Sequence, residues 1–65
     1  MSYLDVIKTV QKRDNLSWAS AYYEVEQTKK AIDRNRDKGY DAQVKVLESY
    51  LGLEEDYLPY FEMAF

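Results

Sequence analysis

The chain has 65 residues and contains neither cysteine nor histidine. Disulfides are therefore excluded, and a structural zinc site is nearly excluded because carboxylates alone hold zinc poorly. The same two absences remove the cysteine nucleophile and the histidine general base that many enzymes use, and no glycine-rich phosphate loop is present. We expect no catalytic residue, no bound metal and no cofactor. The sequence predicts a protein that is not an enzyme.

Glycine, proline and long apolar runs are also scarce. The chain has two glycines and one proline, and none of its apolar runs approaches the roughly 20 residues that a membrane-spanning helix needs. The N-terminus lacks the charged and then apolar layout of a signal peptide. With 46% hydrophobic residues the composition is that of a folded chain rather than a disordered one. We therefore expect a folded cytoplasmic protein without a membrane segment.

The apolar residues that are present recur at helical spacing, and no segment alternates with the period of a strand. Ser2 and Asp5 fit a capping box, Ser17 fits a second N-cap, and Gly39 and Gly52 fit helix ends. These signals predict an all-α fold, a small bundle of three to four short helices in a single domain over 1–65. The predicted helices cover residues 3–13, 17–37, 42–51 and 55–63.

The same spacing predicts which helix faces are buried. Trp18 and Tyr22 start an apolar stripe that continues through Val25 and Ile32, so we expect both aromatic side chains in the core. The third helix, for which Asp41 can serve as N-cap, carries an unusually wide apolar arc. We expect it to be the most deeply buried helix.

Charge is distributed unevenly along the chain, whose net charge is −3. Residues 27–38 carry five basic and two acidic side chains, a net charge of +3, whereas residues 48–65 carry five acidic side chains and no basic one. The stretch DRNRDKGYD, residues 33–41, has acidic and amide residues at positions 1, 3, 5 and 9 of a calcium-binding loop. However, Lys38 replaces the required glycine and Val44 the required glutamate. A helix end followed by a turn is the simpler interpretation.

Nucleic-acid binding is one alternative for the basic segment. Lys29, Lys30, Arg34 and Arg36 could contact phosphates in a compact dimeric DNA-binding regulator. The stretch VLESYLGLEEDYLPYF also resembles the closing helices of lambda-repressor-like domains, in which a leucine-rich helix, a glycine and an acidic and then apolar helix follow one another. This resemblance covers about a quarter of the chain and implies DNA binding. Upstream, residues 17–37 form one unbroken predicted helix, without the spacing of a helix-turn-helix pair.

Aromatic residues are abundant, with seven tyrosines, two phenylalanines and one tryptophan. A core of this size cannot enclose all of them, and tyrosine needs a partner for its hydroxyl group, so several rings should lie at the surface. Aromatic anchors with a polar rim are typical of protein interfaces. The sequence therefore predicts a partner-binding site at the acidic C-terminal region, formed by Glu54, Glu55, Asp56, Tyr57, Tyr60, Phe61 and Phe65.

These observations favour a small protein-interaction module that acts as an inhibitor, adaptor or modulator of a larger protein. If that partner is a nucleic-acid enzyme, the carboxylates could occupy its basic groove. Small acidic chains without cysteine are common among phage and mobile-element accessory proteins, which is an association only. A homodimer is compatible with the small size, and a purely structural oligomer subunit is a further alternative.

Overall fold

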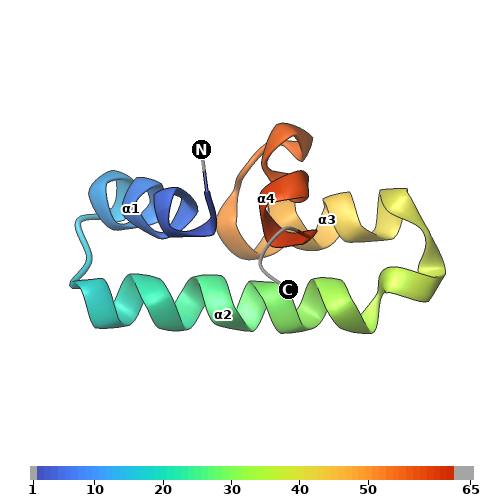
Figure 1. Ribbon diagram of the computed structural model, residues 1–65, viewed down its shortest axis with the longest axis horizontal. Helices are drawn as coiled ribbons and strands as arrows, with labels where there is room; N and C mark the ends of the chain where they lie inside the picture. Colours follow the sequence, from blue (N-terminus) through green and yellow to red (C-terminus); the bar gives the residue numbers. More distant parts are fainter. Residues whose placement is uncertain (1, 63–65) are drawn as a thin grey trace.

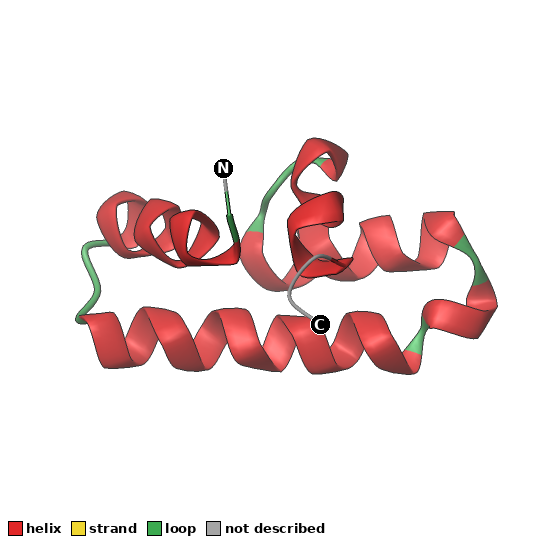
Figure 2. Cartoon of the chain, viewed as in Figure 1, coloured by secondary structure: helices red, strands yellow, loops and turns green. Residues whose placement is uncertain are grey.

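A computed structural model describes residues 2–62 of the chain, and these residues form four α-helices and two short 3-10 helices. The elements are α1 (Tyr3–Asp14), α2 (Trp18–Arg34), η1 (Arg36–Lys38), α3 (Tyr40–Leu51), η2 (Glu55–Tyr57) and α4 (Leu58–Glu62). Figure 2 shows no strand in this part of the chain. The predicted all-α bundle is therefore confirmed.

Helix α2 forms the base of the molecule and runs along its longest dimension (Figure 1). Helices α1 and α3 both pack against α2 and follow one another along it, while the short α4 lies between them and contacts both. The described chain extends over 32 × 21 × 18 Å. None of the helices described between residues 2 and 62 is long and apolar enough to cross a membrane.

Local signals in the sequence set most of the helix ends. The backbone N–H of Ser2 donates to the carboxylate of Asp5 at 2.8 Å, as the predicted capping box requires. The side chain of Ser17 accepts a hydrogen bond from the backbone N–H of Ser20 at 3.2 Å, so the second predicted N-cap is also confirmed. Gly52 ends α3 in the left-handed conformation, with φ +66° and ψ +26°. Short polar side chains thus accept hydrogen bonds from backbone N–H groups at the helix starts that the sequence predicted.

The predicted boundary between the second and third helices was wrong. α2 ends at Arg34 rather than at residue 37, because the Asn35 side chain donates to the carbonyl of Ala31 at 2.8 Å and the chain then turns into η1. Gly39, with φ +97° and ψ +173°, lies directly before α3 and does not follow α2. Asp41 consequently lies inside the first turn of α3 instead of capping it.

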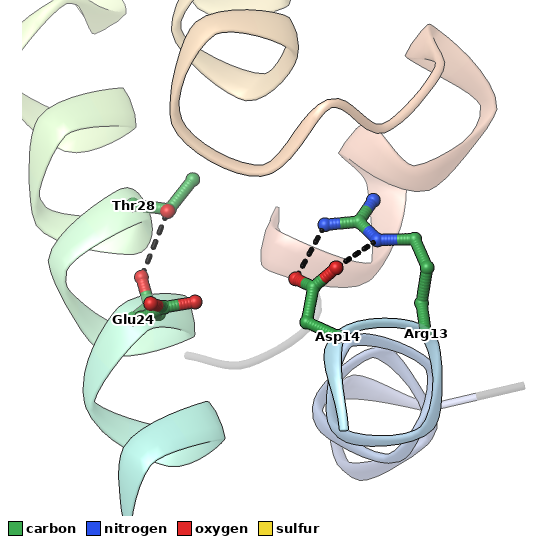
Figure 3. Close-up of polar contacts among 4 residues, drawn as sticks. All are labelled: Arg13, Asp14, Glu24 and Thr28. Carbon is green, nitrogen blue, oxygen red and sulfur yellow. Dashed lines mark hydrogen bonds and ion pairs between the residues drawn. The ribbon is translucent and has the colours of Figure 1, made fainter. Parts of the chain in front are cut away.

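The core is formed by aliphatic side chains from all four α-helices and by one ring, that of Phe61. α2 contributes Ala21, Val25 and Ile32 on one face, together with the buried Thr28. The Thr28 hydroxyl donates to the carbonyl of Glu24 at 2.8 Å (Figure 3), so its burial leaves no unpaired polar group. The remaining core residues are Val6, Ile7, Val10, Leu47, Leu51, Leu53 and Leu58.

Two predictions about burial were wrong. Trp18 and Tyr22 are 42% and 46% exposed, because α1 and α3 cover the face of α2 that carries Val25 and leave these two rings at its edge. α3 is not the most buried helix, since Tyr50 is exposed and α3 has three buried residues, as many as α1 and fewer than the five of α2. Periodicity located the buried face of each helix correctly but overestimated its width.

Candidate partner-binding site

A hollow of about 620 Å³ lies between the second half of α3 and the segment that follows it. Its apolar wall is formed by the half-buried Val44 and the buried Leu53. Four carboxylate residues, all exposed, complete the lining together with Gly52; they are Glu48, Glu54, Glu55 and Asp56. We call this hollow the acidic pocket. It combines an apolar wall with a rim of negative charge.

The backbone of the acidic pocket is set by the end of α3. Gly52 reverses the chain in the left-handed conformation, and its N–H donates to the carbonyl of Glu48 at 2.8 Å. Leu53 then points into the core, which fixes the three acidic residues after it at the surface. The hydroxyl of Tyr40 donates to Glu55 at 3.1 Å and so links the start of α3 to η2.

The end of α1 approaches the same segment from the other side. Arg13 and Asp14 form two hydrogen bonds of 2.9 Å each (Figure 3), and this pairing lowers the pKa of Asp14 below its usual value. A Cβ atom added to Gly52 would lie 3.7 Å from the guanidinium of Arg13. Arg13 is therefore the cation that α1 brings next to the acidic segment.

The predicted partner-binding residues separate into an exposed group and a packed group. Glu54, Glu55 and Asp56 are exposed, as the prediction requires. The rings of Tyr57 and Tyr60 are half-buried and pack against the core, with their centroids 6.2 Å apart and their planes at 74°. Part of each of these two side chains thus remains exposed, close in sequence to the carboxylates.

The prediction that Phe61 is a surface anchor was wrong. Phe61 is fully buried, and its ring packs edge-on against Tyr3 with centroids 5.7 Å apart. The short α4 has a single apolar face, and that face closes the space between α1 and α3, so Phe61 cannot contact a partner. Phe65 lies outside the described residues.

The basic residues of the alternative nucleic-acid site are spread around α2 and η1. Lys29 is half-buried, whereas Lys30 and Arg34 are exposed. Because successive helical residues are about 100° apart, Lys29 and Arg34 are on different sides of α2. Arg36 pairs with Asp33 at 2.8 Å. DNA binding stays a prediction, and the four side chains do not share one helix face.

Among residues 2–62, no three carboxylates are placed to share a metal ion. The acidic residues of the pocket follow one another along the surface. They therefore form a negatively charged surface rather than a set of ligands converging on one point.

Sequence reasoning identified three of the pocket carboxylates but missed its apolar wall. The available signal was Leu53, an isolated apolar residue between Gly52 and the acidic run. Comparisons of this chain with protein-family models, with curated proteins and with solved structures find no match. What the chain does must therefore be inferred from the geometry of its surface.

Proposed function

We propose that this protein is a protein-interaction module that acts as an inhibitor, adaptor or modulator by binding a basic segment of a larger protein in the acidic pocket. The observation that carries the proposal is the combination of Leu53 and Val44 with four exposed carboxylates in one hollow. Lysine and arginine side chains have an apolar stem and a cationic head. Such a side chain matches both parts of the pocket lining.

The charge of the C-terminal segment also favours a basic partner. The segment from residue 48 to residue 65 contains five acidic residues and no basic one, so its own charge is negative. Complementary charge speeds encounter and selects the partner more than it raises affinity. The half-buried rings of Tyr57 and Tyr60 belong to this segment and can supply apolar contact. A basic groove on a nucleic-acid enzyme is one surface of this chemistry.

The test uses a defined probe, a synthetic amphipathic peptide rich in lysine and arginine, and measures its dissociation constant by calorimetry at several salt concentrations. We expect the variant Glu54→Gln/Asp56→Asn to bind more weakly, about tenfold, and with a smaller salt dependence. The control is Asp37→Asn/Asp41→Asn, which removes the same charge from exposed residues that do not line the pocket. Unchanged binding by the first variant, or equal weakening by both, would overturn the proposal.

The place where the peptide binds is tested separately from its affinity. On addition of the peptide, the methyl resonances of Leu53 and Val44 should shift because these residues form the pocket wall. The methyl groups of Val10, buried elsewhere in the core, serve as the reference. Binding without any change at Leu53 would place the peptide outside the pocket and contradict the proposed site.

A further inference from the structure

The longest uncharged run of the chain covers residues 15–23, with the sequence NLSWASAYY. In a protein in which 32% of residues are charged, this run forms the turn before α2 and its first six residues. Trp18, Tyr22 and Tyr23 within it are 42%, 46% and 65% exposed. We call these three rings, together with the exposed Ala19, the aromatic face.

The residues of the aromatic face are neighbours on the helix surface. Tyr22 and Tyr23 follow Ala19 by three and four positions, and Tyr22 follows Trp18 by four, which are the spacings of side chains in contact along a helix. Ala19 has only a methyl group, so it leaves a gap between larger side chains. The face therefore presents three exposed rings around one small residue.

We infer that the aromatic face is the contact through which two copies of this chain form a weak symmetric dimer. A two-fold axis places the residues near it opposite their own counterparts, so a charge close to the axis would meet an identical charge. The aromatic face has no charged member and avoids this repulsion. The acidic pocket is formed by α3 and the segment after it, so the inference is independent of the proposed function.

The size of the face determines how strong the dimer is. Aromatic side chains have roughly 150–250 Å² of surface each, so the exposed fractions of the three rings correspond to roughly 300 Å² per copy. Stable interfaces bury about 1,200–2,000 Å² in total. The rings alone supply about half of the lower value, and we expect a reversible dimer with a dissociation constant between about 10 μM and 1 mM.

Charge substitutions at Ala19 test the inference. Ala19 is exposed and helical, so Ala19→Glu and Ala19→Lys should both fold, which circular dichroism would verify. Each variant alone should sediment as a monomer at concentrations at which the unaltered chain is largely dimeric. An equimolar mixture of the two should recover the dimer, because opposite charges then face one another across the axis. The matched controls are Ser49→Glu and Ser49→Lys, at an exposed position of α3, which should dimerise like the unaltered chain.

Trp18 provides a second readout because it is the only tryptophan. Its fluorescence emission should move to shorter wavelength over the same concentration range in which the sedimenting mass doubles. A monomer at all concentrations up to about 1 mM would overturn the inference. So would a dimer that persists in both Ala19 variants, or a mixture that does not recover association.

Discussion

The hydroxyl of Tyr3 donates a hydrogen bond of 2.5 Å to Oε1 of Glu26, which joins the first turn of α1 to the middle of α2. The same Tyr3 ring packs edge-on against Phe61 of α4. One side chain thus connects three helices, α1, α2 and α4. In a small domain, where each helix is marginal by itself, such a connection should contribute measurably to stability.

Removing the Tyr3 hydroxyl should destabilise the fold. We expect Tyr3→Phe to lower the free energy of unfolding by about 1 kcal/mol, because the ring contact with Phe61 is kept and only the bond to a half-buried carboxylate is lost. Urea denaturation followed by circular dichroism measures the change. Tyr57→Phe is the control, since no described residue accepts a hydrogen bond from that hydroxyl. Equal losses in the two variants would contradict the role of Glu26.

The same hydrogen bond predicts a dependence on alkaline pH. Burial, followed by the hydrogen bond to Glu26 and its negative charge, raises the pKa of Tyr3 above its ordinary value. A raised pKa means that the folded state keeps a proton that the unfolded state loses near pH 10. The contribution of Tyr3 to stability is therefore complete below about pH 10 and declines as the pH rises further. Denaturation at several pH values should show a steeper decline in the unaltered chain than in Tyr3→Phe.

Substitution of Phe61 should affect the fold more than any change in the acidic segment. The ring is fully buried, so Phe61→Ala should cost about 3–5 kcal/mol and leave the domain largely unfolded, given that domains of this size are only marginally stable. Phe61→Leu keeps most of the apolar volume and should cost less. Thermal denaturation of both variants, with Tyr60→Leu as the half-buried control, tests this order. A native melting temperature for Phe61→Ala would show that the ring is not part of the core.

The two glycines should respond differently to alanine. Gly39 has φ +97° and ψ +173°, a region that is essentially restricted to glycine. We expect Gly39→Ala to lower the free energy of unfolding by about 1–3 kcal/mol, although the added Cβ atom would have no neighbour within 4 Å. Gly52 lies in the left-handed helical region, where alanine costs about 1 kcal/mol and asparagine less. Chemical denaturation of Gly39→Ala, Gly52→Ala and Gly52→Asn should rank them in that order of decreasing cost. A larger loss for Gly52→Ala would mean that contact with Arg13 matters more than backbone strain.

Sequence reasoning predicted the parts of this fold that depend on short-range interactions. The capping box of Ser2 and Asp5, the cap at Ser17 and the left-handed Gly52 are decided by atoms a few positions apart. Pro59 is the second residue of α4, where its missing N–H is tolerated. The end of α2 was misplaced because Asn35 can either continue a helix or cap it, and both choices are local.

Burial at the edges of helices could not be predicted in the same way. Trp18 and Tyr22 continue the apolar spacing of α2, but whether they are covered depends on where α1 lies on that helix. Phe61 was expected at the surface because it lies in an acidic aromatic segment, and only the position of α4 between α1 and α3 shows that it is enclosed. The apolar wall of the acidic pocket, formed by Val44 and Leu53, follows from the turn between α3 and η2.

The sequence by itself determined that this chain is helical, where most of its helices begin and end, and that its negative charge gathers near the C-terminus, because each of these depends on residue type and near neighbours. Only the tertiary structure decided which rings are enclosed, that a hollow lies among the carboxylates, and that the uncharged start of α2 is exposed. The reason is physical. Burial is a property of distances between segments, and segments as far apart as Tyr3 and Glu26 meet only once the whole chain has folded.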